Sequence, residues 1–490
     1  MNLRWWLAPI AMLVIAAAPV QTADFDTQLR GAAALYDADK AADALPILDT
    51  MLANTDLPAE RGRIQQLRFF VLARLNKLAE ARQAIEIAVA NAESPSPMVL
   101  GALFKIRALM GDNVPAADTL LLIAATDPKT LNTLPSEMVS DVMRAIVKDE
   151  NRSFDVDFAL QAAGWAPTDA TLGDIDWLRV RLVTGLVKRG RRDEARGVVD
   201  TILNPVQLVR LGIDRRFTAL WPQIEKRLGP GADVADAAYV GAAKARFDKT
   251  PKSLVARLDY AEALNIASRE PEALVISDVV KTPAELAALN QREIWLVNLS
   301  ASLLGDAGRI DEAMARFNAL NASPFDGRPA LISTMINQAL FAASVNRPND
   351  AIAAAELAES KSGALSQFGQ LYLSEARACA LTQLGKKSEA EIAAAALVSK
   401  PDGNDDAYLG AMICLGRLDA AAKSVIRRLG DDDARSDMLF ALQPFLINRD
   451  DVLRDASERK ALRTLKARPD VKAAYLKAGR DMPAAVAPPR

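Results

Sequence analysis

Short polar corners interrupt apolar, helix-favouring stretches at regular intervals along the chain. Each corner starts at a Gly, Asn, Asp or Ser, continues through a few polar residues and reaches an Ala five positions on. Nine corners carry this pattern: Asp39 to Ala44, Asn76 to Ala81, Gly111 to Ala116, Gly190 to Ala195, Ser268 to Ala273, Gly308 to Ala313, Asn346 to Ala351, Gly385 to Ala390 and Gly416 to Ala421. Degenerate corners near Asn151 and Gly231 fill two gaps. From Asp39 to Gly416 this gives ten intervals of about 38 residues, which indicates an internal repeat.

The chemistry of each corner predicts a helical hairpin. Gly and Asn tolerate the left-handed backbone at which helices commonly end. We expect the Asp or Ser that follows to begin the next helix and to accept hydrogen bonds from its first amide groups. The Ala, called the marker alanine below, is small enough to let the two helices approach closely. Ala and Leu dominate the apolar residues, and alternating β-branched runs are scarce, which argues against an extensive sheet.

Residues at fixed distances before each marker alanine extend the pattern. Nine positions before it stand large side chains, which are Leu35, Leu72, Leu186, Leu264, Leu304 and Leu381. Twelve positions before it stand the small residues Ala32, Ala261, Ala301, Ala339 and Ala378, with larger residues at Phe69, Phe104, Val183 and Leu409. Over roughly residues 26–430 the chain thus resembles the tetratricopeptide repeat family, although that family's Trp and Tyr in the first helix are mostly missing. The resemblance implies an all-α fold, an α-solenoid of roughly eleven helical-hairpin repeats that forms a curved superhelix.

The same resemblance implies a binding surface. In that family the first helix of each repeat lines the concave face, with positions 18, 15 and 11 before the marker alanine directed toward a partner. Transferred to this chain, those positions give Trp177, Thr184, Glu262, Trp295, Asn298, Ser302, Ser333, Tyr372 and Glu375. Exposed aromatics beside amides suit the recognition of a protein or peptide. The alternative is that Trp177 and Trp295 simply pack between adjacent repeats.

The domain organisation follows from the irregular stretches. The Pro- and Gly-bearing corner 227–232 predicts a hinge between an N-terminal solenoid half, residues 24–228, and a C-terminal half, residues 234–430. A second irregular stretch covers residues 164–174. We expect a helical cap at 431–481 and a disordered Pro- and Ala-rich tail at 482–490.

The N-terminus is typical of a secretory signal peptide, residues 1–23. Arg4 supplies the positive start, and the apolar stretch Trp5–Val20 is short for a membrane span. Small residues then lead to an expected cleavage site near Ala23, with an uncleaved anchor as the alternative. No cysteine follows the apolar stretch, so an acylated lipoprotein is not expected. We therefore expect a periplasmic or secreted protein.

The composition argues against several kinds of functional site. The chain has 60 basic and 62 acidic residues, no histidine and two cysteines. Without histidine it lacks the commonest general base and zinc ligand, and we expect no metal and no cofactor. No phosphate-binding loop or nucleophile motif is present, so we expect no catalytic activity. The balanced charge gives no electrostatic reason to bind nucleic acid.

Three local features leave alternatives open. Residues 402–406 begin like a calcium loop, but Ala407 and Ile413 stand where that loop needs Gly and Glu, which favours a polar linker that caps the next helix. Cys379 and Cys414 lie about one repeat apart, and we expect two buried free thiols, with a disulfide as the alternative. The basic stretches 188–192 and 451–480 suit either contact with an anionic surface or an ordinary solvated helix face.

A non-catalytic scaffold outside the cytoplasm, which binds a protein or peptide partner in the cell envelope, fits these features best. One alternative is a structural component of a polysaccharide-export or cell-wall machine. Another is the solenoid part of a peptidoglycan-acting enzyme, such as the soluble lytic transglycosylases. The 60 residues after Gly430 are too few for the catalytic domain of such an enzyme.

Overall fold

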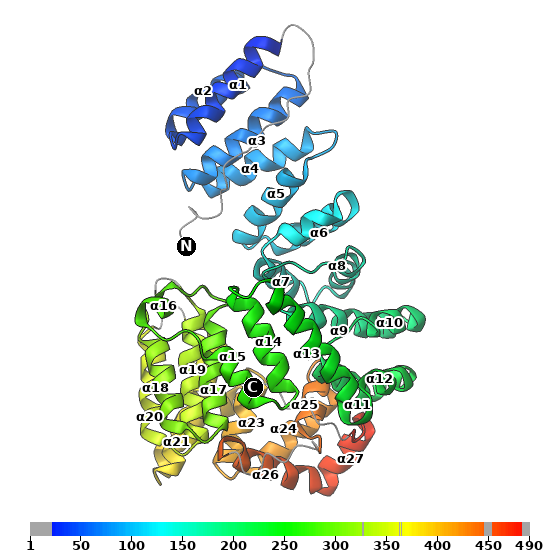
Figure 1. Ribbon diagram of the computed structural model, residues 1–490, viewed down its shortest axis with the longest axis vertical. Helices are drawn as coiled ribbons and strands as arrows, with labels where there is room; N and C mark the ends of the chain where they lie inside the picture. The colour runs from blue at the N-terminus through cyan, green and yellow to red at the C-terminus, as the bar shows by residue number, and fades with distance from the viewer. Residues whose placement is uncertain (1–21, 326–327, 362, 364, 445–452, 483–490) are drawn as a thin grey trace. The chain divides into compact units, whose positions relative to one another are not determined.

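The computed structural model describes residues 22–325, 328–361, 363, 365–444 and 453–482 (Figure 1). The expected signal segment before Thr22 and the tail after Met482 lie outside these residues. Two compact units, Met1–Ala170 and Thr171–Arg490, divide the chain. The first unit contains α1 (Thr22–Asp37), α2 (Ala41–Ala53), α3 (Pro58–Arg74), α4 (Leu78–Ala90), α5 (Pro97–Leu109), α6 (Asn113–Thr126), η2 (Pro128–Thr133), α7 (Ser136–Ala145) and α8 (Glu150–Ala162).

The second unit is also built from helices. It begins with α9 (Leu172–Lys188), α10 (Arg192–Val199), α11 (Pro205–Ile213), η3 (Arg215–Leu220), α12 (Trp221–Leu228), η4 (Pro230–Ala232), α13 (Asp233–Lys249), α14 (Leu254–Ile266), α15 (Glu270–Ser277) and α16 (Pro283–Ala288). It continues with α17 (Ile294–Asp306), α18 (Ile310–Asn321), α19 (Ala330–Ser344), α20 (Pro348–Glu359), α21 (Gln367–Gln383), α22 (Lys387–Ser399), α23 (Asp405–Cys414) and α24 (Leu418–Gly430). The last helices are α25 (Arg435–Ala441), α26 (Leu453–Ala467) and α27 (Pro469–Ala478).

The nine clear corners turn as the sequence predicts. Each starts at a residue with positive φ, between 57° at Asn346 and 77° at Gly111. In each, the next residue donates its amide to the carbonyl five positions before it, for example Arg309 to Leu304 at 2.9 Å. This is the Schellman closure of a helix C-terminus. The repeats therefore share one local backbone geometry despite their divergent side chains.

The marker alanines are all fully buried, with an exposed fraction of 0% at every one of the nine corners. Ala313 and Ala351 share one apolar cluster with Ala301, which stands twelve residues before Ala313. A larger side chain at these places would separate helices that are in contact. The structure thus confirms an all-α solenoid of helical hairpins.

One local prediction about the corners is wrong. The residue before eight of the nine second helices is Lys or Arg rather than a capping Asp or Ser, and the ninth, Asp112, makes no side-chain cap either. The acidic residues lie within the first turn instead, where they favour the helix dipole and pair with the basic residue, as Arg309 does with Glu312 at 2.6 Å. The degenerate corner near Asn151 is the turn between α7, which ends at Ala145, and α8, which begins at Glu150.

The division between the two units differs from the predicted domain limits. It falls between Ala170 and Thr171, inside the second irregular stretch. The predicted hinge at 227–232 lies within the second unit, although its backbone is irregular, with positive φ at Gly229, Gly231 and Ala232.

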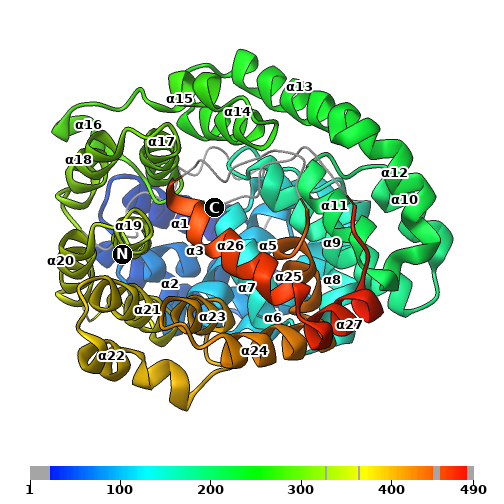
Figure 2. The same cartoon turned by 90° about the horizontal axis from the view of Figure 1, so that it is seen from below.

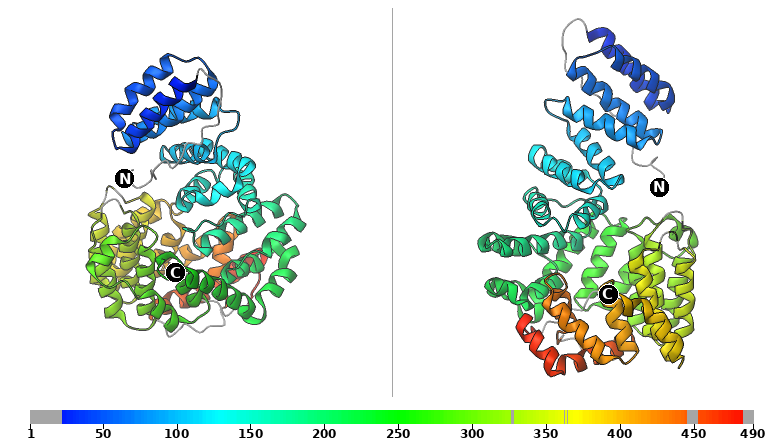
Figure 3. Two further views of the ribbon diagram at one scale, coloured as in Figure 1. Left: turned by 45° about the horizontal axis from the view of Figure 1, so that its top comes forward. Right: turned by 180° about the vertical axis from the view of Figure 1, so that it is seen from behind.

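The second unit closes on itself through its C-terminal residues. Gly479 forms an isolated antiparallel bridge with Asp214, and the amide of Arg480 donates to the carbonyl of Ile213 at 2.9 Å. The guanidinium of Arg480 lies 3.7 Å from the ring centre of Trp221. Helix α25 contacts α11, and Figure 3 shows α25 and α27 beside α11 and α12. Segments more than 250 residues apart in sequence are thus joined, as the separation of 268 between Gly212 and Arg480 shows.

Closure places the helices of the second unit in two layers. Figure 2 shows the first helices of the repeats, α9, α14, α17, α19, α21 and α23, on the inside, and α10, α15, α18, α20 and α22 outside them. We call the surface formed by the six inner helices the inner face. Helix α26 crosses the space that they surround and contacts α17, α19 and α23. The residues after Gly430 therefore do more than cap the last repeat.

Cys379 of α21 and Cys414 of α23 form a disulfide, with their Cα atoms 5.1 Å apart. The prediction of two free thiols is therefore wrong. Both residues lie on inner helices of consecutive repeats, and close packing of these helices brings the two backbones within bonding range. The bond covalently joins two neighbouring repeats of the inner layer.

The corner geometry predicts opposite effects for two glycine substitutions. At Gly308, φ is 73° and an added Cβ meets no atom within 4 Å, so Gly308→Ala should destabilise the chain by about 1–2 kcal/mol through the backbone alone. Gly241 lies in the middle of α13 with equal space, so Gly241→Ala should stabilise it by up to about 1 kcal/mol. Chemical denaturation measures both. Equal effects of the two substitutions would contradict the left-handed corner.

Candidate functional site

The nine residues predicted to face a partner all lie on inner helices of the second unit. Helix α9 carries Trp177 and Thr184, α14 carries Glu262, α17 carries Trp295, Asn298 and Ser302, α19 carries Ser333, and α21 carries Tyr372 and Glu375. Each of the nine side chains is half-buried. They thus form part of the packing of the inner layer while keeping some surface exposed.

Side-chain contacts fix several of these residues. The Asn337 amide of α19 donates to Asn298 of α17 at 3.1 Å, which links two neighbouring inner helices. The Thr184 hydroxyl donates to a backbone carbonyl of its own helix, at Val180. The Arg181 guanidinium lies 4.6 Å from the ring centre of Trp177. The face therefore presents oriented side chains rather than freely rotating ones.

An aromatic pair on α21 extends the predicted set. Tyr372 lies edge-on to Phe368, with ring centres 5.3 Å apart. Phe368 is 55% exposed. It stands four residues before Tyr372 and seven before Glu375, so the three residues share one stripe of the helix. The sequence analysis missed Phe368 because it precedes the three register positions taken from the family.

Glu262 lies in a group of charged residues where α9, α13, α14 and α17 approach one another. Arg292 pairs with Asp174 at 2.7 Å, and Arg246 pairs with Asp259 at 2.7 Å. Burial, reinforced by the charges of Asp259 and Asp174, raises the pKa of Glu262 to about 8. At neutral pH this carboxyl group therefore retains its proton and can donate a hydrogen bond.

Glu375 lies against the backbone of α23 and close to α26. A Cβ added at Gly410 of α23 would lie 1.8 Å from its Oε1, so the carboxyl group occupies the space that this glycine leaves open. Burial raises the pKa of Glu375 well above its usual value, and the charges of Glu458 on α26 and Asp406 on α23 add to the effect. The protonated form of this carboxyl group is therefore favoured.

Residues 402–404 form a linker that caps α23, as the sequence favoured, and Asp405 and Asp406 are the first residues of that helix. The Asn404 side chain accepts a hydrogen bond from the amide of Ala407 and so caps α23. Asp405 pairs with Arg427, and Asp406 pairs with Arg428 at 2.7 Å. These side chains therefore stabilise the hairpin of α23 and α24.

Several cations of the basic stretch 451–480 pair within the chain. Arg468 pairs with Asp419 and Asp470, and Lys466 pairs with Asp481 at 2.5 Å. In the other basic stretch, Arg191 pairs with Glu194 at 2.6 Å. These ion pairs favour the interpretation as ordinary helix surfaces.

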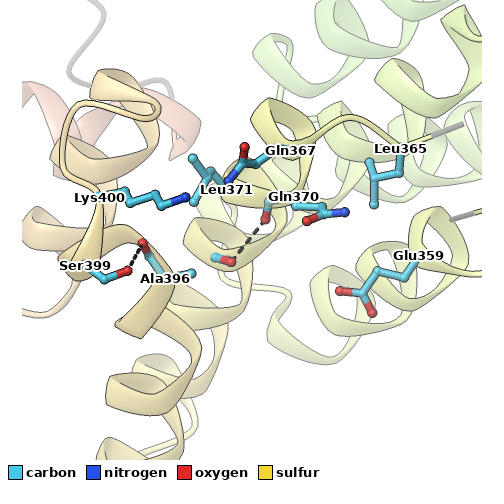
Figure 4. Close-up of a pocket in the computed structure, with 9 residues that line it drawn as sticks. Glu359, Leu365, Gln367, Gln370, Leu371, Ala396, Ser399 and Lys400 are labelled. Atoms are coloured by element: carbon cyan, nitrogen blue, oxygen red, sulfur yellow. Dashed lines mark hydrogen bonds between the residues drawn. The ribbon is translucent and has the colours of Figure 1, made fainter.

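A pocket of about 440 Å³ has none of the nine predicted residues in its lining (Figure 4). Its lining comes from the end of α20, the start of α21 and the end of α22, and includes Glu359, Gln370 and Lys400. The Ser374 hydroxyl donates to the Gln370 carbonyl and the Ser399 hydroxyl to the Ala396 carbonyl, so both hydroxyls are engaged locally.

Within the described ranges, no group of three or more His, Cys, Asp or Glu side chains is placed to hold a metal ion. None of the helices described is both long enough and apolar enough to cross a membrane.

The raised pKa of Glu262 predicts a pH-dependent stability. The folded chain holds this proton more tightly than the unfolded chain, so the group's stabilisation is complete below the unfolded pKa of 4.5 and is lost as the pH rises through about 8. We expect Glu262→Gln to raise the melting temperature at about pH 9 and to change it little at about pH 4. Glu272→Gln is the control, because Arg269 lowers the pKa of Glu272. A higher melting temperature at pH 9 in both variants, or in neither, would contradict the raised pKa of Glu262.

Comparison with known proteins gives only distant similarity. The sequence matches no protein-family model, and no curated protein matches it. One similar solved structure is that of Naa15/Naa10 bound to HypK-THB, with 14% identity, a TM-score of 0.27 and coverage of 92% of this chain and 74% of that chain. Another is the APC/C hetero-tetramer Cut9–Hcn1, with 13% identity, a TM-score of 0.28 and coverage of 90% of both chains. Scores this low carry nothing about partners or activity over to this chain.

Proposed function

We propose that this chain is a non-catalytic scaffold that binds a protein or peptide partner of the cell envelope through the inner face of its second unit. The proposal rests on which side chains that face presents and on the helix that it already binds. Six inner helices present half-buried aromatic, amide and hydroxyl side chains, and the face already holds a helix, α26. A surface that binds one amphipathic helix can offer the same apolar contacts and polar groups to a helix of a partner protein.

The composition of the face suits macromolecular recognition more than catalysis. Tyr372 and Trp295 each combine a large apolar area with a polar group, which is the property that enriches such residues at the centres of protein interfaces. The amides of Asn298 and Asn337 orient each other across two helices. The repeats provide a long surface whose elements are rigidly spaced, and solenoids commonly use such surfaces for binding.

Two features support a location outside the cytoplasm. The N-terminal segment has the charge and length of a secretory signal, and the disulfide between Cys379 and Cys414 suits an oxidising compartment. We propose that the mature chain starts near Asp24 and works in the periplasm or is secreted.

Export is tested by N-terminal sequencing and thiol labelling of protein from fractionated cells. We expect a first residue near Asp24 in the soluble envelope fraction, and no reaction of Cys379 or Cys414 with a maleimide until a reductant is added. An intact Met1 on membrane-bound material, or immediate labelling of both thiols, would contradict the proposed location.

Binding at the inner face is tested with two exposed apolar residues of one repeat. Phe368 of α21 is 55% exposed on the stripe that contains Tyr372 and Glu375, whereas Ile392 of the outer helix α22 is 76% exposed. The partner is first captured by crosslinking the unaltered chain in cells. We expect Phe368→Ser to reduce capture of that envelope protein by about tenfold or more, because exposed aromatic anchors dominate interfaces. Ile392→Ser should leave capture unchanged.

The melting temperature is measured beside capture, and Trp295→Ala is added as a third variant. Since Phe368 is exposed, its substitution should not destabilise the chain. If Ile392→Ser reduces capture as much as Phe368→Ser at equal stability, the inner face is not the binding surface. If Trp295→Ala lowers the melting temperature sharply, Trp295 packs between repeats and does not contact the partner.

A further inference from the structure

The inner face is covered in part by helix α26 of the same chain. Helix α26 contacts α17, α19 and α23, and two of these, α17 and α19, carry four of the nine residues predicted to face a partner (Figure 2). A single residue, Arg468, separates α26 from α27, and residues 479–482 follow α27 directly. We call residues 479–482 the strap. An external partner can use this part of the face only if α26 leaves it.

The strap is fixed on one side to α11 and α12. Gly479 forms the antiparallel bridge to the end of α11. Arg480 donates from Nε to the carbonyl of Gly212 at 2.8 Å and pairs with Glu225 of α12 at 2.5 Å. Its guanidinium also lies over the ring of Trp221. A cation that makes a hydrogen bond, an ion pair and a cation–π contact together is a strong anchor.

The strap is fixed on its other side to α26 and to the residues after α25. The Asp481 carboxylate pairs with Lys466 of α26 at 2.5 Å and accepts a hydrogen bond from the Tyr475 hydroxyl at 2.6 Å. The Met482 amide donates to the side chain of Gln443 at 2.9 Å. The strap therefore links α26, which covers the inner face, to α11 and α12 at the other end of the second unit.

Loss of the strap contacts should open the second unit without unfolding its repeats. In a solenoid each hairpin is stabilised by its neighbours in sequence, so most of the folding free energy is local. The strap contacts join the two ends of the unit and are not part of that packing between neighbours. Proteins open in cooperative parts, and a short segment opens more often than the packed core. Release of the strap is therefore an event separate from global unfolding.

We propose that the strap is an autoinhibitory latch. While it is bound to α11 and α12, it keeps α26 on the inner face; when it is released, α26 leaves and the face becomes accessible to the partner. This inference rests on the proposed function, because the partner binds the face that α26 covers. A partner must otherwise compete with a tethered helix, whose local concentration is in the millimolar range.

Gly479 offers the sharpest way to release the strap. A Cβ added there would lie 2.5 Å from the carbonyl oxygen of Ile213 and 2.6 Å from the side chain of Leu439, so alanine cannot occupy the present position. The φ of Gly479 is −155°, in the extended region that alanine also adopts. Gly479→Ala therefore acts on docking and not on the backbone of the strap itself. Gly241→Ala in α13 is the control, because an added Cβ there meets no atom within 4 Å.

Hydrogen–deuterium exchange measures how often α26 leaves the face, because its amides exchange when it is undocked. We expect Gly479→Ala to speed exchange in α26 by about tenfold or more, and to leave exchange in the outer helices α18 and α20 nearly unchanged. Arg480→Ala, which removes the anchor without adding bulk, should give the same pattern. Arg269→Ala breaks an exposed ion pair with Glu272 elsewhere in the unit and should leave α26 exchange unaltered.

Two exchange results would overturn the inference. Unchanged exchange in α26 in both strap variants would mean that the strap does not hold this helix. Equally faster exchange in α18, α20 and α26 would mean that closure is part of the global fold and not a separate latch. Circular dichroism confirms that each variant retains its helices.

Capture of the envelope partner links the strap to binding. Apparent affinity rises with the fraction of chains whose face is open, so at limiting concentration we expect Gly479→Ala to increase capture by about the same factor as α26 exchange. Adding Phe368→Ser to that chain should abolish the increase. Faster α26 exchange without greater capture would overturn the autoinhibitory role.

The two proposals fail in different ways. If Gly479→Ala changes neither exchange nor capture while Phe368→Ser alone still reduces capture, the proposed function stands and this inference fails. If Phe368→Ser leaves capture unaltered, the proposed function itself fails, and the autoinhibitory role fails with it.

Discussion

A single helical hairpin cannot bury its own apolar surface, and the rest of this structure depends on how each hairpin solves that problem. A left-handed residue reverses the chain, and a fully buried alanine five positions later lets the two helices touch. The hairpin then presents its remaining apolar side chains to its neighbours, so the repeats must stack. Because each corner has the same geometry, the first helices fall on one side and the second helices on the other. The inner face is a consequence of this repetition.

The local part of this arrangement could be predicted from the sequence, since a Gly or Asn at a helix end and an Ala at fixed spacing are short-range signals. The nine clear corners were found for that reason. The degenerate corner near Asn151 was placed a few residues late, because the turn lies between Ala145 and Glu150 and has no left-handed residue to mark it. The cysteine pairing was missed because it depends on how close two neighbouring inner helices lie, and residue spacing within one repeat does not give that distance.

The long-range part could not be predicted in this way. Closure of the second unit depends on Arg480 and Gly479 fitting against Gly212 and Ile213, and no periodic pattern links residues so distant in sequence. The position of α26 depends in turn on that closure, because α27 follows it directly and approaches α11 and α12. The register of the repeats placed the candidate residues on inner helices. It did not indicate that the chain covers part of that surface itself, through the contacts of α26 with α17, α19 and α23.

These observations describe a binding surface formed by repetition and covered in part by the chain's own helix. The most direct test of whether partners bind this inner face uses a photo-crosslinking residue at Ser333 on the inner helix α19. The same residue at Glu356 on the outer helix α20 serves as the comparison. In the purified chain, the account predicts that the probe at 333 crosslinks to α26. In intact cells, it predicts a crosslink from 333 to one envelope protein and none from 356. Crosslinks to the same envelope protein from 356 alone would contradict the account.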